Sequence, residues 1–310
     1  MLPDSLFGPK DLDAKAMKYY IGLPKPPTSR LFIRTNLFIL LVHIRGQVKM
    51  KVFNTLLPFF ISAISGVFAA EFIIGGDDAE IESYPYQISL HVDGEHNCGG
   101  SIVSKTHIVT AAHCFAHVEN TSQLGVRAGS TYHAHGGQLL NVSDYHLHPR
   151  YNETTISHDV AVIKLSKPLE LGPAVAPIRL ASANAGYPET GTITNVTGWG
   201  TAEANTTSLP DTLQALESPV ADRDECIERW RQFQGPEGSA FNVTDTMFCL
   251  GSFKDGETAC HGDSGGPVAI DGTLVGIVSW GDRFCRSDYY PSVYSSISVL
   301  RGWIDSQLRG

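Results

Sequence analysis

The sequence has no Cys-x-x-Cys pair, and none of its six cysteines lies in the first 97 residues. The cysteines are widely spaced between residues 98 and 285. This spacing argues against a zinc site, and we expect no metal and no cofactor. An even number of cysteines confined to one region favours a disulfide framework in an oxidising compartment.

Basic residues are scarce after residue 72. Residues 1–72 hold nine of the 23 Lys and Arg and four of the 32 Asp and Glu, which leaves 14 basic and 28 acidic residues in 73–310. A body this acidic should be repelled by a phosphate backbone. We therefore expect no nucleic-acid partner.

Long apolar runs are also missing. The run from Val52 to Ile64 is short for a membrane span, but it follows a short basic start at Met50 and Lys51. With a small-residue cleavage site after Ala69, residues 50–69 have the features of a secretory signal peptide. The sequence thus indicates a secreted, extracellular protein.

Residues 1–49 stand before this signal, although a signal peptide belongs at the N-terminus. We hypothesise that Met50 is the true start and that 1–49 is a mis-assigned extension. The alternative is a membrane anchor at residues 31–44, a stretch that is short and contains Arg34. We favour the first explanation and expect no membrane partner.

Thirty glycines and seventeen prolines predict a fold rich in turns. From residue 73 onward, short apolar runs alternate with turn clusters, which is typical of an all-β protein. The last stretch, Val299 to Leu308, instead has helical spacing. The predicted strands are Gln87–His91, His107–Thr110, Val160–Leu165, Gly191–Thr197 and Leu274–Trp280.

A candidate nucleophile lies in the segment Gly262-Asp263-Ser264-Gly265-Gly266-Pro267. A serine hydroxyl needs a base to take its proton, and flanking glycines allow a tight turn that exposes N–H groups. The string also fits the Gly-x-Ser-x-Gly pattern of lipases and esterases, in which the histidine follows the serine. No histidine follows Ser264, so the base must lie upstream.

Two upstream segments supply the other members of a catalytic triad. His113 lies in Thr110-Ala111-Ala112-His113-Cys114, where a disulfide at Cys114 could hold it in place. Asp159 directly precedes the predicted strand 160–165, where a carboxylate is costly unless it has a partner. The order His, Asp, Ser is that of the chymotrypsin branch of serine proteases.

With these segments the chain resembles trypsin-like serine proteases across residues 73–310. The resemblance implies two six-stranded antiparallel β-barrels, a C-terminal helix, and an active site between the barrels. Ser264 would attack the scissile carbonyl, His113 would carry the proton, and Asp159 would orient His113. Further matching segments are Ile73-Ile74-Gly75-Gly76, Cys98-Gly99-Gly100-Ser101, Thr197-Gly198-Trp199-Gly200 and Val278-Ser279-Trp280-Gly281.

The resemblance implies further roles. The N–H groups of Gly262 and Ser264 would form the oxyanion hole. A cut before Ile73 would free an amine that pairs with Asp263 and organises the site. The implied disulfides are Cys98–Cys114, Cys226–Cys249 and Cys260–Cys285, whereas the sequence alone leaves fifteen pairings open.

The activation site departs from the family pattern. Phe72, and not Lys or Arg, precedes Ile73, so a tryptic activator is not expected. The propeptide would comprise only residues 70–72. Trimming by an aminopeptidase-like enzyme and a cut after Phe72 both remain open.

The substrate pocket also departs from that of trypsins. Thr258 stands six residues before Ser264, where trypsins have an aspartate that binds Arg or Lys. A buried guanidinium would find no partner there, so we predict cleavage after medium or large apolar residues. Other acids close in sequence could supply an unexpected carboxylate, namely Glu257, Asp282 and Asp288. The remaining pocket residues implied by the resemblance are Ser279, Trp280, Gly281 and Ser292.

The expected partners are protein or peptide substrates, with protein protease inhibitors as further candidates, and the protein is expected to be a monomer. The main alternative is a non-catalytic protease homologue that acts as a binding protein. It is disfavoured because all three triad residues are present. Asn-x-Ser/Thr motifs provide candidate glycosylation sites at Asn120, Asn141, Asn152, Asn195, Asn205 and Asn242.

Overall fold

The structure, a computed structural model, describes residues 76–201, 208–233, 242–252, 258–282, 285 and 289–309. The predictions for residues 1–49, the signal at 50–69 and the propeptide at 70–72 lie outside the described residues. The same holds for Ile73, Asn205, Glu257 and Asp288.

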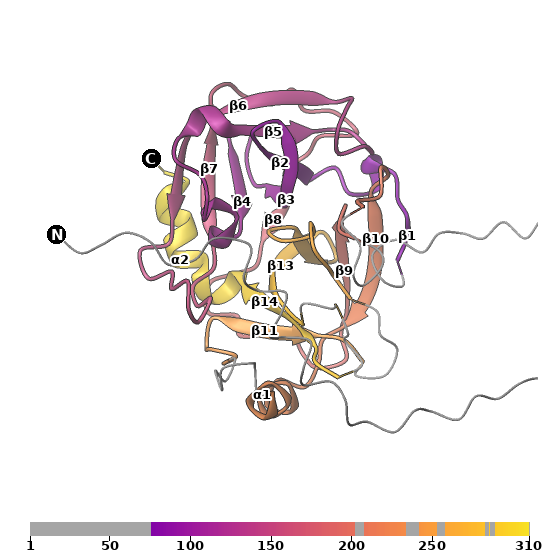
Figure 1. The fold of residues 1–310 in the computed structure, drawn as a ribbon, viewed down its shortest axis with the longest axis vertical. Helices are drawn as coiled ribbons and strands as arrows, with labels where there is room; N and C mark the ends of the chain where they lie inside the picture. Colours follow the sequence, from indigo (N-terminus) through magenta and orange to yellow (C-terminus); the bar gives the residue numbers. More distant parts are fainter. Residues whose placement is uncertain are drawn as a thin grey trace, which may run out of the picture. The chain divides into compact units, whose positions relative to one another are not determined.

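Six antiparallel strands form a closed barrel in the first half of the described chain, in the order β2-β3-β4-β7-β6-β5 (Figure 1). Alternation of buried and exposed residues is clearest in β5, where every second side chain faces the core. All neighbours on the path are paired antiparallel. The strands are β2 (Gln87–Val92), β3 (Glu95–Ile102), β4 (His107–Thr110), β5 (Leu124–Ala128), β6 (Gln138–Leu147) and β7 (Ala161–Leu165).

The second half forms an eight-stranded sheet. Its main path is β10-β9-β12-β13-β14-β11, with β1 paired to β10 and β8 paired in parallel to β13. An isolated bridge between Val220 and Leu250 joins the chain beyond β10 to β11, so six strands close on themselves through a single bridge. The strands are β1 (Asp77–Asp78), β8 (Arg179–Leu180), β9 (Ile193–Gly198), β10 (Gln214–Pro219), β11 (Met247–Leu250), β12 (Pro267–Ile270), β13 (Thr273–Trp280) and β14 (Ser292–Ser296).

The all-β prediction is therefore confirmed, and two short edge strands extend the expected second barrel. The C-terminal helix α2 (Ile297–Gln307) begins and ends close to its predicted bounds. Its residues Ile297, Leu300 and Ile304 belong to the same buried cluster as the first barrel's core. Figure 1 shows α2 beside β4 and β7, so the end of the chain returns to cover the first barrel.

A second helix, α1 (Arg223–Gln232), was not predicted. Asp222 caps it, because its carboxylate accepts a hydrogen bond from Glu225 N at 2.9 Å. The helix buries Cys226 and Trp230, which lie four residues apart on one face. Trp230 Nε1 donates to Pro291 O at 2.9 Å, which attaches the helix to the strand region before β14.

Three disulfides cross-link the described chain. They join Cys98 to Cys114, Cys226 to Cys249, and Cys260 to Cys285, the same pairs that the family resemblance implied. The first fixes the turn after β4, the second joins α1 to β11, and the third joins the segment before Ser264 to the chain between β13 and β14. None of the described helices is both long and apolar enough to span a bilayer.

Candidate active site

His113 and Asp159 meet because β4 and β7 are antiparallel neighbours. Thr110 at the end of β4 pairs with Ala161 at the start of β7. Residues that follow Thr110 and residues that precede Ala161 therefore emerge at the same end of the barrel. The short 3-10 helix Ala112–Phe115 carries His113, and the Cys98–Cys114 bridge ties that helix to β3.

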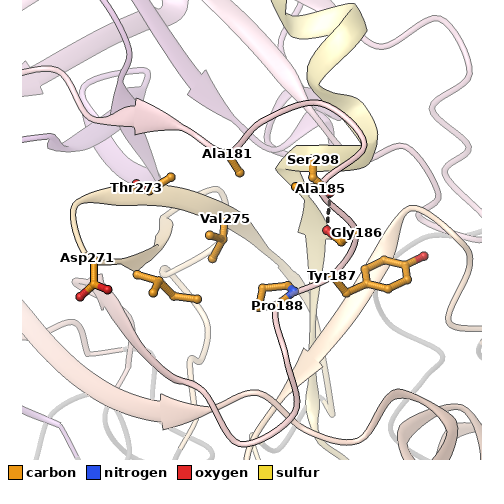
Figure 2. A pocket seen from close by; sticks show the side chains of 10 residues that line it. Ala181, Ala185, Gly186, Tyr187, Pro188, Asp271, Thr273, Val275 and Ser298 are labelled. Carbon is orange, nitrogen blue, oxygen red and sulfur yellow. Dashed lines mark hydrogen bonds between the residues drawn. The ribbon is translucent and has the colours of Figure 1, made fainter.

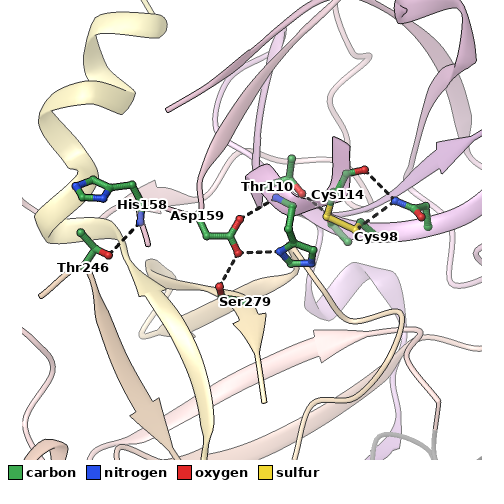
Figure 3. A network of polar contacts seen from close by, with 10 residues as sticks. Cys98, Thr110, Cys114, His158, Asp159, Thr246 and Ser279 are labelled. Atoms are coloured by element: carbon green, nitrogen blue, oxygen red, sulfur yellow. Dashed lines mark hydrogen bonds and ion pairs between the residues drawn. A yellow bond between two sulfur atoms is a disulfide. The ribbon is translucent and has the colours of Figure 1, made fainter. Parts of the chain in front are cut away.

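The Asp159 carboxylate is fully buried and accepts three hydrogen bonds, shown in Figure 3. His113 N donates to Oδ1 at 2.9 Å, His113 Nδ1 lies 2.8 Å from Oδ2, and Ser279 Oγ donates to Oδ2 at 2.5 Å. Because an ionised carboxylate only accepts, the contact assigns the proton of neutral His113 to Nδ1. Nε2 is left as the basic nitrogen.

The pKa of His113 lies above its usual value as the net result of opposing influences. Burial lowers the pKa, since it disfavours the imidazolium. The charge of Asp159 and its hydrogen bond raise the pKa by more. The pair thus stabilises the protonated ring that general base catalysis would create.

Ser264 reaches this end of the first barrel from the second sheet, just before β12. Its carbonyl accepts a hydrogen bond from Gly99 N of β3 at 2.7 Å. The next residue, Gly265, has φ +77°, and a Cβ there would collide with Thr110 Oγ1. In the part of the chain that the structure describes, no hydrogen bond joins Ser264 Oγ to His113. Such contacts commonly tighten only when substrate binds.

Two backbone N–H groups beside Ser264 have no acceptor among the described residues. These are the N–H groups of Gly262 and Ser264, which the sequence singled out as the oxyanion hole. Gly262 has φ +99°, and its carbonyl accepts from His96 Nε2 at 3.0 Å. His96 in turn contacts Ser89 Oγ through Nδ1 at 2.7 Å. The hydrogen bond from His96 therefore holds the turn that carries both N–H groups.

Asp263 lies on the other side of Ser264 and is fully buried. Its carboxylate accepts from Gly200 N at 2.8 Å and from Cys260 N at 2.9 Å. A Cβ at Gly198 or Gly200 would collide with the carboxylate, so the two glycines provide its space. Burial raises the pKa of Asp263 to about 6, although the two hydrogen bonds lower it. Its expected partner, the Ile73 amine, lies outside the described residues.

A cavity of about 240 Å³ opens beside Ser264. Its lining includes the Cys260–Cys285 bridge and four of the residues proposed for the substrate pocket, namely Ser279, Trp280, Gly281 and Ser292. Thr258 lies behind this wall and not in it: it is 3% exposed, and its hydroxyl is hydrogen-bonded to that of Ser292. Asp282 also lines the cavity.

Another cavity, of about 340 Å³, is unrelated to these residues (Figure 2). It lies between the segment 181–188, the β12–β13 hairpin and the start of α2, where Ser298 Oγ donates to Gly186 O at 2.6 Å. Its lining is mostly apolar and includes Tyr187, Pro188 and Val275. None of the residues predicted to act in catalysis faces it.

The described residues offer two groups of His and Cys close enough for a metal ion, Cys98–His113–Cys114 and Cys260–His261–Cys285. In both groups the cysteines form a disulfide. A metal ligand is a thiolate, which a disulfide sulfur cannot provide. Each group therefore retains only one ligand, its histidine.

In the loop before Asp159, two histidine rings pack in tilted contacts with each other and with Trp303 of α2. His148 is 7% exposed and packs between His158, with ring centres 4.8 Å apart, and Trp303 of α2, at 5.0 Å. Its Nδ1 accepts from Arg150 N at 3.1 Å. Burial, followed by the charges of His158 and Arg150, lowers the pKa of His148 to about 4. The folded state thus favours the neutral form of His148.

We expect the protein to lose stability as the pH falls from about 6.5 towards 4. In this range His148 is protonated in the unfolded state but stays neutral in the folded state, so protonation favours unfolding. Thermal unfolding measured across this range should show a smaller pH dependence for His148→Phe, which keeps a ring but cannot titrate. His117→Phe, at an exposed histidine, is the control. Equal pH dependence in His148→Phe and the parent would contradict the assignment.

Sequence reasoning missed two contributors to the site. Ser279 was assigned to the pocket, and it does line the cavity, but its hydroxyl is committed to Asp159. His96 was not singled out, although it holds the Gly262 carbonyl. Neither role leaves a local signal, because each depends on a partner more than 100 residues away in sequence.

Comparison with known proteins identifies close relatives. A family model described as Trypsin matches residues 73–304. Trypsin alpha of Drosophila melanogaster is 42% identical over 234 residues, covering 76% of this chain and 86% of that protein. Trypsin 5G1 of Aedes aegypti is 38% identical over 233 residues, covering 75% and 83%.

A solved structure is also similar. It is the crystal structure of the scabies mite inactivated protease paralogue S-D1, which is 29% identical and superposes with a TM-score of 0.69. The match covers 77% of this chain and 98% of that one. The likeness therefore extends over nearly the whole of the mite protein.

Proposed function

Because the chain belongs to the trypsin family of serine proteases, we propose that it is a secreted endopeptidase that uses His113, Asp159 and Ser264. The observation that carries this proposal is the contact between buried Asp159 and His113 Nδ1 at 2.8 Å. It leaves Nε2 as a base on the side of the ring away from the carboxylate. Protein or peptide substrates follow from the family.

In the proposed reaction, His113 Nε2 takes the Ser264 Oγ proton while Oγ forms a bond to the scissile carbonyl carbon. The N–H groups of Gly262 and Ser264 stabilise the oxygen that becomes negative. The carbon–nitrogen bond then breaks, and the leaving amine takes the proton from His113. Water, deprotonated by His113, releases the acyl group and restores Ser264.

We further propose that a cut before Ile73 activates the protein. The buried Asp263 carboxylate accepts two backbone hydrogen bonds but forms no ion pair with any of the described residues, and burial raises its pKa to about 6. A freed amine would ionise the acid and fix the turn that presents Gly262 and Ser264. This proposal includes a start at Met50, a signal at 50–69 and a propeptide at 70–72.

For the residue before the scissile bond, we propose a medium or large apolar side chain. The hydroxyl of Ser292, which lines the pocket, is hydrogen-bonded to that of Thr258 behind it, and neither group offers a charge to Arg or Lys. Gly281 faces Ser292 across a space that a Cβ would narrow. Among the described residues of the lining, Asp282 is the one acid that could reverse this preference.

A panel of peptides that differ only at this residue tests the pocket. We expect kcat/KM for Phe, Tyr or Leu to exceed that for Arg or Lys by roughly 10²-fold or more, since a desolvated cation would lack a partner. Thr258→Asp should narrow or invert the ratio, and Asp282→Asn should leave it unchanged. Highest rates for Arg or Lys, abolished by Asp282→Asn, would overturn the proposal and identify the carboxylate responsible.

A non-catalytic homologue is the second candidate, because the similar mite protein is described as an inactivated protease paralogue. Reaction with a serine-directed organophosphate separates the two. We expect one equivalent to attach at Ser264 after cleavage before Ile73, and none in Ser264→Ala. Absence of labelling in the correctly cleaved, folded protein would favour the binding protein.

A further inference from the structure

A hairpin stands immediately before the catalytic aspartate. Asn152 and Ser157 form an isolated antiparallel bridge, with Asn152 N donating to Ser157 O at 3.2 Å. The acceptor sequence for N-linked glycans, Asn152-Glu153-Thr154, starts at this bridge and runs into the loop of the hairpin. The chain passes from the hairpin to Asp159 within two residues of Ser157.

The acceptor side chain is exposed and held in one orientation. Asn152 Oδ1 accepts from Thr154 N at 3.0 Å, from Thr155 N at 2.8 Å and from Thr155 Oγ1 at 3.1 Å. Its Nδ2, the atom that a glycan would occupy, donates to none of the described residues. The amide is therefore fixed through its oxygen, and its nitrogen is not engaged by any described residue.

The C-terminal side of the hairpin is anchored on the second sheet, although its sequence neighbours belong to the first barrel. His158 N donates to Thr246 Oγ1 at 3.2 Å (Figure 3). Ile156 packs against the cluster around Trp230 and Met247, against which the pocket residue Trp280 also packs. The hairpin thus packs on the same cluster as Trp280, which lines the cavity beside Ser264.

The other described acceptor sequences lie in different settings. Asn195 is half-buried in β9, which is paired on both sides. Asn141 is exposed on β6, whose neighbours are β5 and β7. Asn120 caps the 3-10 helix Thr121–Gln123, and Asn242 is exposed at the end of a described segment. Asn152 is the one among them that adjoins the catalytic aspartate.

We propose that Asn152 carries an N-linked glycan that restricts access of large protein substrates to the site while leaving short peptides unaffected. This inference rests on the proposed function, since the modification requires secretion. A glycan is bulky and hydrophilic, and the anchored hairpin limits how far it can swing away. A folded protein must pass this volume to place a bond beside Ser264, whereas a short peptide need not.

The modification itself is a transfer from an activated, lipid-linked oligosaccharyl diphosphate. A bond forms between Asn152 Nδ2 and the anomeric carbon of the sugar, and the bond from that carbon to the diphosphate oxygen breaks. The lipid diphosphate leaves, and the amide nitrogen gives up one proton to a base of the transferring enzyme. No oxidant or reductant is needed.

The hairpin offers a closely matched set of variants. Thr154→Ala destroys the acceptor sequence but leaves the three donors to Asn152 Oδ1, because the contribution of residue 154 is its backbone N–H. Thr154→Ser keeps the acceptor sequence. Asn141→Gln removes an exposed acceptor from the outer face of the first barrel. All four proteins, including the parent, would be made in a glycosylating host and cleaved before Ile73.

Two measurements then test the inference: mass at residue 152 before and after amidase removal of glycans, and the ratio of kcat/KM for casein to kcat/KM for a short peptide. We expect a glycan at Asn152 in the parent and Thr154→Ser. Thr154→Ala should raise the ratio by roughly threefold to tenfold with the peptide rate unchanged. Asn141→Gln should match the parent.

Each possible negative result would contradict a different part of the proposal. A protein that cleaves the peptide but has no glycan at Asn152 overturns the inference alone. A glycan at Asn152 with an unchanged ratio in Thr154→Ala overturns its proposed effect on access. If neither peptide nor casein is cleaved by the parent, the proposed peptidase function fails instead.

Discussion

Asp159→Asn should lower kcat by about 10⁴-fold, the loss associated with this change in a Ser-His-Asp triad. Asp159 accepts three hydrogen bonds, from His113 N, His113 Nδ1 and Ser279 Oγ. An amide has a single acceptor oxygen, and its NH₂ group would favour the His113 tautomer with the proton on Nε2. That tautomer turns a donor towards Ser264 and cannot take its proton.

The pH profile gives this prediction a second readout. His113 acts as a base only when neutral, so activity falls as pH drops through its pKa. Asp159 raises that pKa against the effect of burial. Without the charge, the acid limb of kcat/KM should move to lower pH. Asp245→Asn, at a fully exposed acid, is the control; activity of Asp159→Asn within tenfold of the parent would contradict the assigned role.

Asp263→Asn should lower kcat/KM by about 10²–10³-fold after cleavage before Ile73, which is the cost of losing one oxyanion-hole donor. Both oxygens of Asp263 accept backbone N–H bonds, and an amide would turn its own N–H groups towards one of these donors. It would also offer no charge to a freed amine. The turn that carries Gly262 should then lose its fixed position.

Active-site labelling and calorimetry separate this effect from unfolding. We expect Asp263→Asn to retain the contact between His113 and Asp159 and a cooperative unfolding transition, with slow labelling of Ser264. A protein that retains Phe72 should behave in the same way, because its Ile73 amine is blocked. Full activity of either protein would show that activity does not depend on a pair between Asp263 and the Ile73 amine.

The strands that were predicted are those with a clear apolar pattern. His107–Thr110 was placed correctly because all four residues are buried, and β13 because its buried run is long. Helix α1 was missed because only Cys226 and Trp230 of its ten residues are buried, so it has little periodicity. The pair Asp222 and Glu225 at its start was an available helix signal.

The sequence could propose the residues of the site but not their geometry. His113, Asp159 and Ser264 stand in recognisable segments, whereas the register of Thr110 with Ala161, which brings the first two together, depends on pairing across 51 residues. The pocket shows the same limit. Thr258 could be identified from its spacing to Ser264, but its position behind Ser292 follows from how β14 packs.

Gly198 and Gly200, the two glycines around the Asp263 carboxylate, make the proposed site sensitive to substitution at positions that take no part in the reaction. A gene copy that acquired alanine at position 198 or 200 would have no room for the acid. The three residues proposed for catalysis would be unchanged in an alignment, although the protein would have lost activity. Surveys that separate active proteases from non-catalytic homologues should therefore inspect positions 198 and 200 as well.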